Sequence, residues 1–83
     1  MKIIAVGNMQ MLLGFMLAGI KEVLNTEDSS VTLQFLKETA KEDCIVIIYA
    51  AIYDEIQGEI KELQAKNPTF IPYRFSGGSL RWR

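Results

Sequence analysis

The sequence of 83 residues contains no histidine and a single cysteine, Cys44. One thiol cannot form an internal disulfide, and a structural zinc site needs about four cysteine or histidine ligands. Without histidine, the chain also lacks the side chain that most often serves as a general base near neutral pH. These absences argue against a disulfide framework, a conventional zinc site and most acid–base enzymes.

The chain also lacks an excess of either charge. Nine Lys and Arg stand against ten Asp and Glu, which gives a net charge of −1 at pH 7. Proteins that bind nucleic acid through its phosphates need a basic excess, so we expect no nucleic-acid partner. All the acidic residues lie from Glu22 to Glu62, and residues 3–20 carry no charge at all.

The uncharged residues 3–20 have two alternative interpretations: a membrane span or signal peptide, or a buried strand and helix of a soluble domain. Gly7, Asn8 and Gln10 interrupt the stretch in its first half, where a lipid-facing helix would be continuously apolar. We therefore favour a strand, a turn and a helix, and we expect no direct insertion into a membrane.

Short hydrophobic runs alternate with capping and turn residues along the chain. They predict strands over residues 2–6, 21–24, 44–49 and 69–73, and helices over residues 9–19, 28–41 and 51–65. Asp28 is suited to begin the second helix and Gly19 to end the first. This alternation predicts an α/β fold: a small three-layer sandwich with a four-stranded parallel sheet of flavodoxin- or receiver-like topology, as a single domain over residues 1–78.

Two strands carry more specific information. Residues 44–49 read CIVIIY and are apolar at every position, which predicts that helices cover both faces of this strand. Pro72 cannot donate a backbone hydrogen bond, so the last strand is expected at an edge of the sheet.

Ligands of open parallel sheets bind at the carboxyl ends of the strands. After the first predicted strand, Gly7 and Gly14 are too far apart for a phosphate-binding loop. A receiver domain would need acidic residues at the ends of the first and third strands, where this chain has Asn8, Tyr49 and Ala50. A receiver-like or flavodoxin-like small binding module nevertheless remains as the alternative function.

Few residues remain as candidates for catalysis. Cys44 opens a predicted buried strand behind two acidic residues, an environment that raises the pKa of a thiol, and is interpreted as a small buried residue. The acidic pairs at residues 42–43 and 54–55 are typical of solvated helix faces. We predict no catalytic, cofactor-binding or metal-binding residue.

The first predicted helix is apolar on all sides, whereas a helix that covers a sheet normally keeps one polar face. The C-terminal residues mix aromatic side chains with arginines, types that are enriched at interface hot spots. The candidate partner contacts are Phe15, Met16, Phe75, Leu80 and Trp82. We also expect that the isolated chain can form a homodimer through the first helix.

Several stretches together carry a resemblance to a known family. Residues 14–23 read GFMLAGIKEV, and residues 2–7, 45–48 and 76–78 match in the same register, as do Ile52, Glu55-Ile56 and Glu59-Ile60. Over residues 1–78 the chain resembles the F subunit of the archaeal and vacuolar-type rotary ATPases. It departs from the usual pattern at Met16, where that family usually has Arg, at Asn8, where Asp is frequent, and at Tyr49-Ala50, which replaces a common Thr-Glu.

The resemblance implies a non-catalytic central-stalk subunit that helps couple ATP synthesis or hydrolysis to proton or sodium transport. It implies binding to the coiled-coil D subunit of the stalk, contact with the catalytic A and B head subunits through a C-terminal segment, and a cytoplasmic position, peripheral to the membrane through the complex. Residues 79–83 are expected to start a C-terminal helix that is truncated or missing. No cofactor is implied, and close helix packing is expected at Gly14, Leu17, Ala18 and Gly19.

Overall fold

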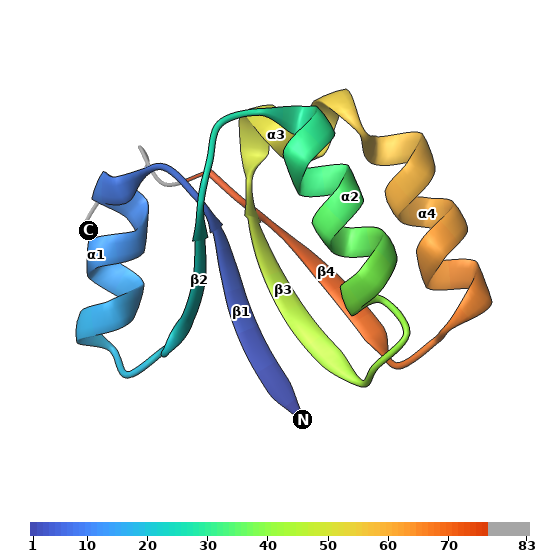
Figure 1. Ribbon diagram of the computed structural model, residues 1–83, viewed down its shortest axis with the longest axis horizontal. Helices are drawn as coiled ribbons and strands as arrows, with labels where there is room; N and C mark the ends of the chain where they lie inside the picture. Colours follow the sequence, from blue (N-terminus) through green and yellow to red (C-terminus); the bar gives the residue numbers. More distant parts are fainter. Residues whose placement is uncertain (77–83) are drawn as a thin grey trace, which may run out of the picture.

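Four strands form one parallel sheet in the computed structural model, which describes residues 1–76. In chain order the elements are β1 (Lys2–Gly7), α1 (Met9–Leu17), β2 (Glu22–Asn25), α2 (Ser29–Thr39), β3 (Cys44–Tyr49), α3 (Ala50–Glu55), α4 (Gln57–Lys66) and β4 (Phe70–Phe75) (Figure 1). The strand order is β2-β1-β3-β4. The predicted α/β class and parallel sheet are confirmed, and β4, which contains Pro72, is an edge strand as expected.

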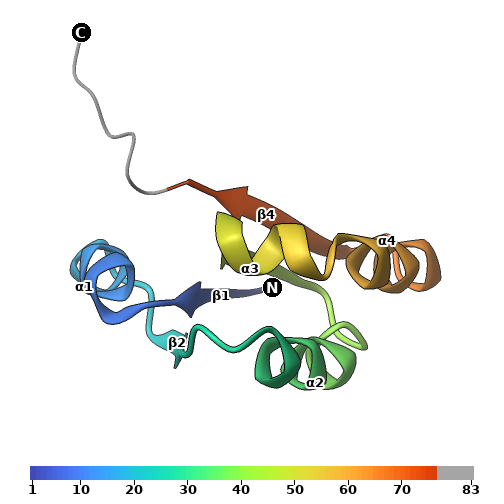
Figure 2. The same cartoon turned by 90° about the horizontal axis from the view of Figure 1, so that it is seen from above.

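The helices are divided unequally between the two faces of the sheet. The chain steps from β1 to β2 in one direction and from β2 to β3 and β4 in the other. Right-handed crossovers therefore place α1 on one face and α2, α3 and α4 on the opposite face. Figure 2 shows α1 alone on its side of the sheet.

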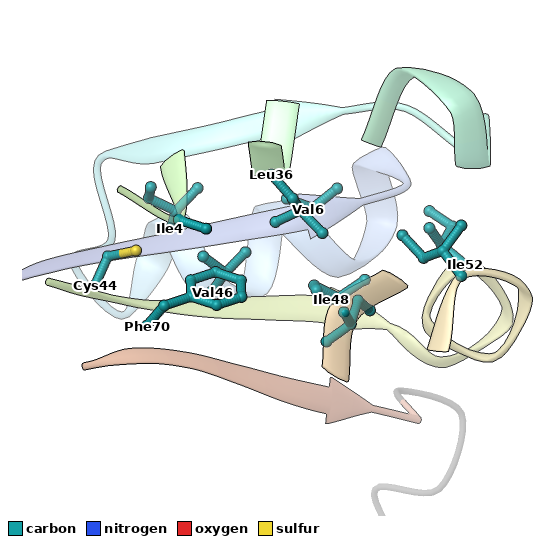
Figure 3. Packing of buried hydrophobic residues seen from close by; sticks show 11 residues of the cluster. Ile4, Val6, Leu36, Cys44, Val46, Ile48, Ile52 and Phe70 are labelled. Atoms are coloured by element: carbon teal, nitrogen blue, oxygen red, sulfur yellow. The ribbon is translucent and has the colours of Figure 1, made fainter. Parts of the chain in front are cut away.

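The hydrophobic core lies between the sheet and the face covered by α2, α3 and α4. In the register of the sheet, Ile4 is opposite Val46 and Val6 is opposite Ile48, so these side chains point to the same face. Helical residues pack against them, and the fully buried members include Leu36, Ile52 and Ile60. Figure 3 shows Cys44 and Phe70 toward one end of this cluster and Ile52 toward the other.

The helix ends follow local chemistry that the sequence already indicated. Asp28 Oδ1 accepts hydrogen bonds from the backbone N–H groups of Ser30 and Val31, which confirms it as the cap of α2. Gly19 follows α1 with a φ of +103°, and the N–H groups of Gly19 and Ile20 donate to the carbonyls of Met16 and Phe15. This pair of bonds is a Schellman motif, so the prediction that Gly19 ends the helix is confirmed.

The prediction of one continuous helix over residues 51–65 is wrong. Ile56 has φ −118° and ψ 23°, which separates α3 from α4. Ile52, Ile56 and Ile60 are nevertheless all at most 4% exposed, so the two short helices and the residue between them all contribute to the core.

The prediction that helices cover both faces of β3 is also wrong. Cys44, Val46 and Ile48 are fully buried, whereas the alternate residues of the strand are only half-buried. The reason is that α1, alone on its face, packs over β1 and β2. Among residues 1–76, no helix combines the length and apolarity that a bilayer crossing requires.

Because Leu36 is fully buried and Leu17 is 91% exposed, the same substitution should act very differently at the two positions. We expect Leu36→Ala to lower the free energy of unfolding by about 2–5 kcal/mol, since it leaves a cavity in the core. Leu17→Ala is the matched control and should change it by no more than about 0.5 kcal/mol. Urea denaturation of the two variants measures the difference, and equal effects would contradict the described core.

Candidate interaction surface

Side chains pack closely around Gly7 at the crevice between β1 and β3, where this topology usually binds ligands. A Cβ atom added to Gly7 would lie 2.5 Å from Met11 Sδ and 3.2 Å from Tyr49 Cβ. Asn8 follows Gly7, and its Oδ1 accepts a hydrogen bond of 2.9 Å from the Met11 N–H, which caps α1. Met11, Tyr49 and Asn8 are therefore occupied in packing and capping.

Charged groups at this edge pair with each other. Arg74 Nε and Nη2 donate to the two carboxylate oxygens of Asp54 at 2.9 and 3.0 Å, a bidentate pair that joins β4 to α3. The hydrogen bond from Arg74 lowers the pKa of the Asp54 carboxyl below its ordinary value, and the same contact raises the pKa of Arg74. Within residues 1–76, no cluster of three or more acidic or cysteine side chains could hold a metal ion.

Cys44 has the structural role that the sequence predicted. It is fully buried, and its Sγ lies 3.6 Å from the carbonyl oxygen of Thr39, to which the thiol donates. Burial raises the pKa of the Cys44 thiol, and the nearby carboxylate of Glu42 raises it further.

The most distinctive surface is the side of the sheet that faces away from the core. We call it the open sheet face and define it by the outward side chains of β1, β3 and β4. Parallel pairing aligns Ile3 with Ile45 and Ile71 in one row, and Ala5 with Ile47 and Tyr73 in the next. Ile3 is 46%, Ile71 41% and Tyr73 58% exposed. Half-buried Ile45 lies between Ile3 and Ile71, and Tyr73 is next to Ile71 on the same side of β4, so these apolar side chains are continuous rather than isolated, whereas Ala5 is fully buried.

Helix α1 forms a wall along one side of the open sheet face. Two residues of α1 itself, Met11 and Leu12, are buried. The ring of Phe15, also on α1, contacts the ring of Phe75 edge-on, with centroids 5.0 Å apart and planes at 72°. The structure thus brings together two of the predicted partner contacts, Phe15 and Phe75, from distant parts of the sequence. Met16 lies on the same helix and is 38% exposed, whereas Leu80 and Trp82 lie outside the described residues.

This surface carries no charge. Every residue of α1 is uncharged, and so are the side chains that form the open sheet face. A surface of this kind cannot select an anion or a cation by charge, but it can bury apolar area against another polypeptide. The arrangement therefore indicates a protein-binding surface.

The small residues around the end of α1 are all exposed. A Cβ on Gly14 would meet no atom within 4 Å, while Gly19 has the positive φ that favours glycine. Leu17 and Ala18 are exposed as well. Within the described chain, Gly19 is thus required by its backbone conformation, and the other three are not held in close contact with a second element.

Sequence reasoning missed the contribution of the strands to this surface. It singled out α1 because that helix lacks a polar face, but it assigned Ile3, Ile71 and Tyr73 to no surface. The strands that contain these residues have the same apolar pattern whether a second helix covers them or not. The pattern alone therefore could not distinguish a covered strand from an exposed one.

Comparison with protein families matches residues 3–78 to the family described as ATP synthase (F/14-kDa) subunit. The matched stretch includes nearly all of the helices and strands described above. Searches of curated proteins and of solved structures found no match.

Removing the partner of Asp54 should return its pKa toward the ordinary value. The lowered pKa means that the Asp54–Arg74 pair stabilises the fold above the pKa of the unfolded carboxyl and ceases to do so as pH falls through the folded value. We expect Arg74→Gln to raise the pKa of Asp54, as followed by NMR of its carboxyl carbon during a pH titration. Lys61→Gln, at an exposed site on α4, is the control, and an unchanged Asp54 pKa in Arg74→Gln would contradict the ion pair.

Alanine substitution should have opposite effects at the two glycines of this region. Gly14→Ala should raise the free energy of unfolding by about 0.5–1 kcal/mol, because alanine favours the helix and meets no neighbour. Gly19→Ala should lower it by about 1 kcal/mol or more, because the residue must keep a positive φ. Urea denaturation of both variants provides the test, and a loss of stability in Gly14→Ala would show that its surroundings are tighter than described.

Proposed function

Because the chain belongs to the family of ATP synthase F/14-kDa subunits, and so to the subunits of a rotary ATPase, we propose that it is a non-catalytic subunit of the central stalk. The observation that carries this proposal is the family match over residues 3–78. The uncharged surface formed by α1 and the open sheet face supports it, since a stalk subunit acts by binding other subunits.

The proposed partner is the coiled-coil D subunit of the stalk. Through this contact the chain helps to couple ATP synthesis or hydrolysis to the transport of protons or sodium ions. Coupling by rotation needs an interface that holds its position under load, and burial of a broad apolar area provides such an interface without relying on salt-sensitive surface ion pairs.

The contact residues we propose are Phe15, Met16 and Phe75, together with Leu80 and Trp82 in the C-terminal residues. The exposed apolar side chains of the open sheet face extend this set. Leu17 is 91% exposed, and burying a leucine completely contributes about 1.5–3 kcal/mol. Gly14 and Ala18, which have no bulky side chain, would allow a partner helix to approach α1 closely.

Two further features of the proposal concern the assembled complex. Contact with the catalytic A and B head subunits would use the segment that follows the sandwich. The chain would be peripheral on the cytoplasmic side, held at the membrane by its partners.

The proposed function predicts that the chain and the coiled-coil stalk subunit of the same organism form a stable one-to-one complex. Co-expression, co-purification and light scattering of the eluted peak measure the stoichiometry. Absence of a complex, both for this chain and for a version extended by a C-terminal helix, would contradict the stalk role.

Charges introduced into the proposed surface should break this complex. We expect Met16→Glu combined with Tyr73→Glu to weaken binding at least about tenfold, because two carboxylates would lose water in an apolar interface. Gln64→Glu, at an exposed site on α4, adds charge away from the surface and should bind normally. Isothermal titration with the coiled-coil partner compares the three proteins, and equal affinities would place the contact elsewhere.

A further inference from the structure

A second surface lies on the opposite side of the sheet, where Figure 1 shows α2 and α4 next to each other. An open groove runs between these two helices. Its floor is made by the half-buried side chains of Leu33 and Leu63 and by buried Ala40. Asn67 closes one end, because its Nδ2 donates to the carbonyl of Ala40 at 2.8 Å and ties the end of α4 to the end of α2. The groove therefore has an apolar floor and a fixed end.

Over most of its length the two walls of this groove carry opposite charges. Lys37 and Lys41 line the α2 side, and Glu59 and Glu62 line the α4 side, while Asp43 and Lys66 lie at the end that Asn67 closes. Among the described residues, Lys37, Glu59 and Glu62 form no ion pair, and Lys41 approaches only Glu38, at 3.9 Å, on its own side. The walls do not neutralise each other, so both remain available to a third element.

The helix dipoles account for only part of this arrangement. Lys37 in the last turn of α2 and Glu59 in the first turn of α4 suit the partial charges at those helix ends. Lys41 lies beyond the end of α2, and Glu62 lies in the middle of α4, where the dipole gives no such preference. Between the charged walls, Leu33 on α2 and Leu63 on α4 supply the apolar contact from each side.

We propose that this groove binds a single amphipathic helix of another polypeptide, with an apolar stripe bordered by acidic residues on one edge and basic residues on the other. Apolar anchors on the stripe would cover Leu33 and Leu63, while the acidic edge lies along Lys37 and Lys41 and the basic edge along Glu59 and Glu62. From Leu33 to Lys41 the groove spans about 12 Å, which accommodates roughly two turns of a helix.

The opposite charges on the walls would also fix the direction of the bound helix. Turning an amphipathic helix end to end exchanges its two edges while the apolar stripe still faces the floor. The reversed helix would then place like charges together on both walls, which is unfavourable. This inference goes beyond the stalk contact proposed above, which uses the other side of the sheet and α1.

The probe for this groove is a synthetic helical peptide of about 18 residues, with leucines along one stripe, glutamates on one edge and lysines on the other. Titration of the 15N-labelled chain with up to about 1 mM peptide at low salt detects even weak binding by NMR. We expect shifts of the backbone amides of α2 and α4 around Leu33, Lys37 and Glu62. Peptides with lysines on both edges, or glutamates on both edges, should bind about fivefold more weakly.

Matched variants test whether the charged walls select the peptide. Lys37→Glu combined with Lys41→Glu makes both walls acidic, so the peptide with two lysine edges should become the better ligand. Lys61→Glu, on α4 outside the groove, should leave the order of the peptides unchanged. The NMR spectra of both variants also report directly that they are folded.

Three results would overturn the proposal. The first is the absence of any shift at the highest peptide concentration. The second is binding whose shifts lie on α1 and the open sheet face, or whose strength ignores the edge charges. The third is movement of the groove resonances with protein concentration alone, which would identify a second copy of the chain as the occupant.

Discussion

The handedness of the connections between parallel strands determines most of this molecule. Right-handed crossovers, applied to the strand order β2-β1-β3-β4, leave α1 alone on one face and place α2, α3 and α4 on the other. The face with three helices holds the core around Val46 and Leu36. The face with one helix is only partly covered, so the same strands that build the core also present an apolar surface.

The unequal division of helices between the two faces is the main feature that the amino-acid sequence could not predict. Strand positions, the parallel sheet, the edge position of Pro72 and the turn at Gly19 all follow from local chemistry, and the structure agrees with them. The uncovered side of β3 could not be predicted, because an apolar strand reads alike whether a helix or a partner covers it. The break at Ile56 could not be predicted either, because the apolar spacing of residues 51–65 is that of one continuous helix.

The candidate site was predictable in its residue types and not in its geometry. Phe15 and Phe75 stand out as candidate contact aromatics in the sequence, but their edge-on contact depends on how α1 and the end of β4 meet in the fold. Two surfaces of different chemistry result on opposite sides of one small sheet. One is the uncharged surface of α1 and the open sheet face, and the other is the groove between α2 and α4 with its charged walls.

The close packing around Gly7, between the ends of β1 and β3, has a further consequence. In related topologies a ligand binds at this position, between the strands and the neighbouring helix. Here Met11 and Tyr49 occupy the space beside Gly7, and Asn8 fixes the start of α1. A side chain at this position would first have to displace Met11 of α1 or Tyr49 at the end of β3. The end of β1 therefore links the position of α1 to that of the strand end beside it.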